Sequence, residues 1–125
     1  MDLLILEPKP NTPFVKFDPI TGIMELKGRS TPENTLDFYS VLQDWLIKYS
    51  ATPQEITIVN VQLEYFNTSS SKCILDLFKK FAELYKSGHK VQINWFYEEE
   101  DEDMQEAGEV YCDILGVPFD ILVIK

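Results

Sequence analysis

Hydrophobic residues recur along this chain with two spacings, every second residue in some segments and every three to four residues in others. Alternating or short apolar segments at residues 3–6, 14–17, 23–27, 55–65, 90–97 and 119–124 predict strands. Helical spacing within residues 30–49, 69–87 and 104–115 predicts three helices, each followed by a glycine or a proline. The predicted order is therefore β-β-β-α-β-α-β-α-β.

Strands that are separated by helices usually pair in parallel through right-handed crossovers, whereas the first strands are expected to pair as a hairpin. Two of the predicted strands carry polar side chains on one face, namely Asn60, Gln62 and Glu64 on one strand and Gln92 and Asn94 on another. A sheet covered on both sides would be apolar at these positions. We therefore expect an α/β domain spanning residues 1–125, with a mixed sheet of about five to six strands, helices mainly on one face, and the other face open or used by a partner.

Two local details are less regular. Ser30 and Glu33 have capping-box spacing, and Pro32 suits a first helical turn, so the first helix is expected to start near residue 30. In the strand at residues 55–65, Val59, Val61, Leu63 and Tyr65 are expected to face one way, and Ile56 and Ile58 are out of phase with them. A bulge near residue 58, or burial of both faces at the strand start, would account for the change of phase.

Composition and charge narrow the function. The chain is 45% hydrophobic, which is enough for a packed core, and its formal charge is −10. Arg29 is its one arginine and the lysines form no cluster, so binding to nucleic acid or to an anionic membrane is not expected. Cys73 and Cys112 fall on apolar helix faces and are expected to be buried free thiols, which are typical of a reducing compartment. The N-terminus is acidic and does not resemble a signal peptide, so we expect a cytoplasmic protein. No catalytic, cofactor or zinc motif occurs.

The most informative segment is Tyr65-Phe66-Asn67-Thr68-Ser69-Ser70-Ser71-Lys72, which joins a predicted strand to a predicted helix. Asn67 or Thr68 is expected to cap the helix. One cap is sufficient for a helix, so four consecutive hydroxyls exceed the structural need, although they are also common at helix starts. Unpaired N–H groups and the helix dipole favour an anion there, and Lys72 lies on the same side of the first turn as Thr68. This pattern indicates a phosphorylation switch rather than an enzyme.

An acidic run follows the predicted strand at residues 90–97. Glu98-Glu99-Glu100-Asp101-Glu102-Asp103 is extended by Glu106 and Glu109. Such a run is typically solvated, but it also suits a divalent metal or a basic surface on a partner, and its last acids favour a helix start. Its order does not match an EF-hand loop.

Three segments together resemble a known family. They are Gly28-Arg29-Ser30-Thr31-Pro32-Glu33, the hydroxyl segment from Glu64 to Lys72, and Trp95-Phe96-Tyr97-Glu98 running into Asp101–Glu109. They are similar to the SiaC-type regulatory phosphoproteins of bacteria, which resemble STAS domains and anti-sigma-factor antagonists in acting as partner-switch proteins. The resemblance implies a phosphoacceptor at Thr68, a cognate kinase, a PP2C-type phosphatase, and an effector that binds the unmodified form, such as a diguanylate cyclase.

The resemblance also implies which other residues act. The residues expected to surround the phosphosite and contact partners are Tyr65, Phe66, Asn67, Ser69, Ser70, Ser71 and Lys72, and further contacts are expected at Arg29, Glu98, Asp101, Glu102 and Asp103. The leading hypothesis is thus a non-enzymatic cytoplasmic signalling protein with no cofactor or metal. The alternatives are a constitutive adaptor that binds through the open sheet face, and a metal-dependent enzyme that uses residues 98–109.

Overall fold

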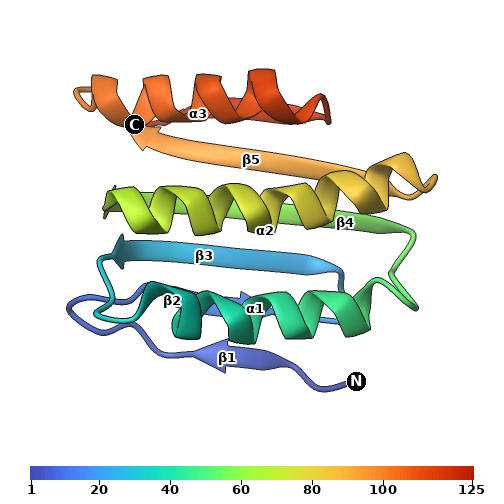
Figure 1. The fold of residues 1–125 in the computed structure, drawn as a ribbon. Coiled ribbons are helices and arrows are strands. Elements are labelled where there is room, and N and C mark those ends of the chain that lie inside the picture. The colour runs from blue at the N-terminus through green and yellow to red at the C-terminus, as the bar shows by residue number, and fades with distance from the viewer.

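A computed structural model describes residues 1–125 and contains nine helices and strands. Figure 1 shows how the chain is arranged. The order of the helices and strands is that predicted from the sequence. The elements are β1 (Leu4–Leu6), β2 (Phe14–Phe17), β3 (Ile23–Ser30), α1 (Thr35–Tyr49), β4 (Ile56–Phe66), α2 (Thr68–Lys86), β5 (Lys90–Glu98), α3 (Glu102–Leu115) and β6 (Phe119–Ile124).

The six strands form one mixed sheet in the order β1-β2-β3-β4-β5-β6. The first three strands pair antiparallel, and β3, β4, β5 and β6 pair in parallel. Each parallel pair is joined by a helix, and all three helices lie side by side on the same face of the sheet (Figure 1). Because each helix returns the chain from one parallel strand to the next, the three helix N-termini gather at the edge where β3, β4 and β5 end.

The core lies between the helices and this covered face. Trp95, Tyr49, Phe17, Phe78 and Phe81 are all at most 1% exposed. The apolar residues whose helical spacing predicted the first helix form its inner side: Leu42, Trp45, Leu46 and Tyr49 are buried, and Phe38 packs against the core. The sheet's other face carries no helix and presents the expected amides and carboxylates, so the one-sided arrangement predicted from the strand pattern is also confirmed.

The predicted start of the first helix is wrong. Ser30 is the last residue of β3, where it pairs with Phe66, and the helix is capped by Asn34, whose side chain accepts a hydrogen bond from the Asp37 N–H at 3.1 Å. Pairing with β4 extends β3 beyond the predicted residue 27. The capping-box spacing of Ser30 and Glu33 is therefore coincidental.

The predicted bulge near residue 58 is also wrong in position. The bulge lies instead where the register between β3 and β4 shifts: Gly28 pairs with Leu63, and the next residue, Arg29, pairs with Tyr65. Glu64 is therefore the extra, unpaired residue of β4. This bulge turns Tyr65 away from the core, and its side chain is 48% exposed. Ile56 and Ile58 lie on the face without helices, which explains their phase without a second bulge.

Smaller corrections concern the third helix and the thiols. Helix α3 starts at Glu102, two residues before the predicted start at 104, because Asp101 caps it. Both cysteines are free, and Cys73 is buried as expected, whereas Cys112 is only partly buried. Gly88 and Gly116, predicted as helix stops, both have positive φ, of 105° and 63°.

Candidate functional site

The hydroxyl segment forms the turn between β4 and α2. Asn67 caps the helix, as one of the two predicted caps, and its side-chain oxygen accepts the Ser70 N–H at 2.9 Å. The Asn67 N–H in turn donates to the carbonyl oxygen of Ser30 at 3.2 Å, and the Ser71 N–H donates to the Asn67 carbonyl oxygen at 2.9 Å. The start of α2 is therefore anchored to the end of β3.

Ser70 has no exposed surface and takes part in a buried chain of hydroxyls. Its Oγ donates to the carbonyl oxygen of Ser30 at 3.0 Å and accepts from Ser30 Oγ at 2.9 Å. Ser30 Oγ lies 2.6 Å from the Tyr39 hydroxyl. Since the one proton of Ser30 Oγ is given to Ser70, Tyr39 is the donor in that last contact. Burial raises the pKa of Tyr39 well above its ordinary value, so this hydroxyl stays protonated and able to donate.

Ser71 is committed to the other neighbour of α2. The Tyr111 hydroxyl from α3 donates to the Ser71 carbonyl oxygen at 3.0 Å, and Ser71 Oγ therefore donates to the Tyr111 oxygen, also at 3.0 Å. Burial raises the pKa of Tyr111 as well. The first turn of α2 is thus pinned on one side to β3 and α1 and on the other side to α3.

Thr68 and Ser69 are different, because both are exposed and neither hydroxyl makes a hydrogen bond. The backbone N–H groups of Thr68 and Ser69 are also unpaired, because Asn67 accepts hydrogen bonds only from the N–H groups of Ser70 and Ser71. Helix α2 has no acidic residue in its first turn, whereas α1 has Asp37 there and α3 has Glu102 and Asp103. The start of α2 is therefore the one helix start in the fold whose dipole meets no carboxylate.

The residues that flank this turn are only partly brought together. Arg29 lies 4.9 Å from the centre of the Tyr65 ring, so the one arginine and the exposed tyrosine form a cation–π pair at the end of β3 and β4. Lys72 is exposed and forms no ion pair. Phe66 instead turns inward, with its ring 6.2 Å from that of Trp95. Tyr65, Thr68, Ser69 and Lys72 are thus the exposed members of the predicted motif.

The acidic run has a structural role at its centre. Asp101 accepts the Met104 N–H at 3.1 Å as the cap of α3, and Glu102 and Asp103 occupy the first turn, as the sequence indicated. Glu98 ends β5, and Glu99 and Glu100 form the exposed turn. The structure contains no group of three or more His, Cys, Asp and Glu side chains placed to hold a metal ion.

Sequence reasoning missed Ser30, Tyr39 and Tyr111, the three residues whose side chains hold Ser70 and Ser71. Tyr39 and Tyr111 lie on helices far from the hydroxyl segment in sequence, and Ser30 resembled a helix cap. Nothing in a single sequence distinguishes a tyrosine that bonds a distant serine from one that fills the core.

None of the helices combines the length and the apolar composition needed to cross a bilayer.

Known proteins share both the sequence pattern and the fold. The sequence profile of the SiaC family of regulatory phosphoproteins matches residues 6–124. An uncharacterised protein of Pseudomonas aeruginosa strain UCBPP-PA14 is 29% identical over 111 residues, which cover 89% of this chain and 88% of that protein.

Solved structures of SiaC from Pseudomonas aeruginosa match nearly the whole chain at 27% identity. Apo-SiaC superposes with a TM-score of 0.90, covering 98% of this chain and 99% of that one. SiaC in complex with the diguanylate cyclase SiaD, of which it is the activator, superposes with a TM-score of 0.92, covering 97% of this chain and 99% of that one. A match over 119 of 125 residues, together with this fold, decides the class: the chain belongs to the SiaC family of regulatory phosphoproteins and is a regulator rather than an enzyme.

Proposed function

We propose that this chain is a switch controlled by reversible phosphorylation of Thr68. A cognate Ser/Thr kinase adds the phosphate, a PP2C-type phosphatase removes it, and the unmodified form binds and regulates an effector, a diguanylate cyclase of cyclic-di-GMP signalling. Such a switch would act in the cytoplasm, where the kinase finds ATP. The observation that carries the proposal is the division of the hydroxyls: Thr68 and Ser69 are exposed and unbonded, whereas Ser70 and Ser71 are held by Ser30 and Tyr111.

The position of Thr68 explains why a phosphate would leave the fold intact. At neutral pH a phosphate carries about −1.5 to −2 charges. At the first position of α2 it lies beside two unpaired N–H groups and the positive end of the dipole, in a turn that contains no carboxylate. A negative charge at an exposed helix start stabilises by about 0.3–1 kcal/mol. The added charge therefore acts mainly on whatever docks at this surface, because a partner must remove water from a dianion or repel it.

The identity of the effector is supported by a relative. SiaC of Pseudomonas aeruginosa is the activator of the diguanylate cyclase SiaD and has been seen in complex with it. That relative shares this fold over 97% of the present chain. We therefore assign a diguanylate cyclase as the partner of the unmodified form, and the family's description as regulatory phosphoproteins supports a kinase and a phosphatase as the enzymes that set its state.

The site assignment is tested by intact mass after co-expression with a cognate Ser/Thr kinase. The wild-type chain should gain about 80 Da, the mass of one phosphate. Thr68→Ala should remove the gain, and Ser69→Ala, a matched change at the other exposed hydroxyl, should keep it. A mass gain that persists in Thr68→Ala and disappears in Ser69→Ala would show that Ser69 carries the phosphate and would refute the assignment to Thr68.

The switch itself is tested by binding to the cognate cyclase. Phosphorylated wild-type chain should bind at least about tenfold more weakly than unmodified chain, the equivalent of 1.4 kcal/mol. The phosphatase should restore binding. Ser69→Ala treated with the kinase should behave as wild type, and Thr68→Ala should bind whether or not kinase is present.

A constitutive adaptor is the second candidate, favoured by the uncovered sheet face, which lies on the other side of the sheet from α2. An adaptor that uses only that face would bind its partner with the same affinity before and after phosphorylation. If the phosphorylated and the unmodified chain bind the cyclase with equal affinity, the switch hypothesis is refuted and the adaptor hypothesis is supported.

A further inference from the structure

The uncovered face of the sheet is hollowed at the end where β4, β5 and β6 finish. Three adjoining hollows of about 430, 230 and 340 Å³ share Gln62 as a lining residue. Phe96 lines the first two hollows, Lys27 the second and third, and Glu64 the first and third. They form one trough across the strands, which runs from the chain near Phe14 to Ile124 in β6.

Next to the trough, the face is closed by its own hydrogen bonds up to Asn60, which lines the border of the second hollow. Gln92 donates to Asn94 at 3.1 Å, and Asn94 donates to Asn60 at 2.9 Å, so these amides form a satisfied ladder across β4 and β5. Gln62, one step further along β4, makes no such bond and points into the trough. The half with the trough is thus the part of the face with hydrogen-bonding groups left for a partner.

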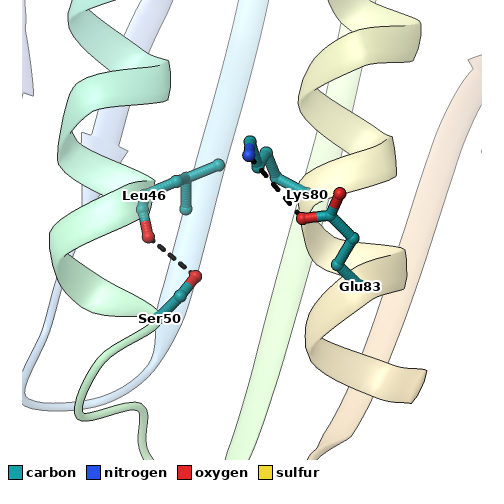
Figure 2. Close-up of polar contacts among 4 residues, drawn as sticks. All are labelled: Leu46, Ser50, Lys80 and Glu83. Carbon is teal, nitrogen blue, oxygen red and sulfur yellow. Dashed lines mark hydrogen bonds and ion pairs between the residues drawn. The ribbon is translucent and has the colours of Figure 1, made fainter. Parts of the chain in front are cut away.

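The end of the trough at β5 and β6 combines an apolar floor with an acidic rim. Phe96 and Ile124 are partly buried lining residues, and Glu64, Glu98 and Glu100 stand beside them. The bulge in β4 makes Glu64 an extra residue at this rim. None of the three carboxylates forms an ion pair. The one ion pair of the protein joins Lys80 to Glu83 at 3.6 Å on α2, on the covered side (Figure 2).

We propose that this trough docks a basic amphipathic segment of the effector, with an apolar side chain over Phe96 and Ile124 and lysine or arginine at Glu64 and Glu98. The inference rests on the proposed function, because it names the part of the chain that meets the same effector. Unpaired carboxylates around an apolar floor complement such a segment in both charge and polarity. A second copy of this chain fits poorly, because its formal charge is −10 and its acids would meet this rim.

The test compares two double variants that change the net charge equally. Glu64→Lys with Glu98→Lys reverses the rim, and Glu55→Lys with Asp120→Lys reverses two exposed acids at the opposite ends of the strands. All four side chains are exposed, so both doubles should fold. With this chain unphosphorylated, its binding to the cognate cyclase should weaken more than about tenfold in the rim double and less than about threefold in the control.

A second pair of variants tests the floor without changing charge. Phe96→Ala should weaken binding to the cyclase, whereas Ile47→Ala, a change at an apolar residue 56% exposed on α1 and so on the covered side of the sheet, should not. An equal loss in both charge doubles would mean that only net charge matters and would overturn the proposal. A wild-type dimer that dissociates in the rim double would show a second copy as the occupant and would overturn it too.

The two proposals can fail separately. If the cyclase binds the wild type and both double variants equally, the trough is not its docking site, but the proposed function is unaffected. A cyclase that does not bind the wild type would remove the proposed effector, and the trough is then tested with a short synthetic peptide of leucine and lysine. Peptide-induced NMR shift changes centred on Gln62 and Phe96 would support the trough, and changes centred elsewhere would refute it.

Discussion

The buried hydroxyl chain at the start of α2 allows its protons to be counted one by one. Tyr39 donates to Ser30 Oγ, Ser30 Oγ donates to Ser70 Oγ, and Ser70 Oγ donates to the carbonyl oxygen of Ser30, over distances of 2.6, 2.9 and 3.0 Å. Each of the three protons has one acceptor, and Ser30 and Ser70 have no exposed surface where water could replace one. The cost of a substitution should therefore depend on how many protons it leaves without an acceptor.

Ser70→Ala removes the last link. Only the contact between the Tyr39 hydroxyl and Ser30 Oγ then remains, and it can use one of their two protons. One buried donor therefore has no acceptor, and we expect a loss of about 1–3 kcal/mol in the free energy of unfolding. Tyr39→Phe removes only the first donor and leaves every remaining proton paired, so the expected loss is about 1 kcal/mol. The double variant again strands one proton, that of Ser30. It should therefore be about as stable as Ser70→Ala alone, with the two losses failing to add by about 1 kcal/mol.

Equilibrium urea unfolding followed by tryptophan fluorescence measures all three variants, with Thr68→Ala as the control. Thr68 is exposed and unbonded, so its substitution should change stability by less than about 0.5 kcal/mol. The m-value should stay constant across the series. A double variant that loses the sum of the two single losses, or a Ser70→Ala chain with the wild-type midpoint, would refute the proton count.

Three other features of the fold give predictions of their own. Because burial raises the pKa of Tyr39 and Tyr111 above the ordinary value of 10.0, the unfolded chain loses these protons first. The stability that the two tyrosines contribute should be fully present below pH 10.0 and should fall above it, by up to about 1.4 kcal/mol per pH unit for each tyrosine, and Tyr111→Phe should reduce that slope in a series of unfolding curves. Gly108→Ala should destabilise by about 1–3 kcal/mol, because its methyl would lie 2.5 Å from the buried Trp95 ring; an unchanged melting temperature would contradict this. Asp101→Ala should cost about 1 kcal/mol through loss of the α3 cap, whereas Asp101→Asn should retain most of the stability in the same melting assay.

The order of the elements and the uncovered face could be read from the sequence because both are local properties. Side-chain spacing reports which face of a helix or strand is buried, whatever it packs against. The polar positions of β4 and β5 therefore predicted helices on one side only. The start of α2 was predicted to be capped by Asn67 or Thr68, and Asn67 is the cap, because a cap acts within its own turn.

The sequence also marked the hydroxyl segment as the place to look, but it did not separate the hydroxyls from one another. Four adjacent side chains of nearly equal chemistry differ only in what surrounds them. Ser70 faces Ser30 and Tyr39, Ser71 faces Tyr111, and Thr68 and Ser69 face solvent. Those neighbours arrive from α1, β3 and α3, so only the packing of the helices decides which hydroxyl an enzyme can reach.

Strand ends and bulges were likewise fixed by partners distant in sequence. The end of β3 at Ser30 and the extra residue at Glu64 follow from pairing between β3 and β4, which no pattern within either strand encodes. That pairing turns Tyr65 outward to Arg29 and sets Glu64 at the rim of the trough. The sequence alone thus determined which elements form and which faces they bury, because those depend on spacing along the chain. The tertiary structure alone decided which polar groups remain unpaired at the surface, because that depends on contacts between elements.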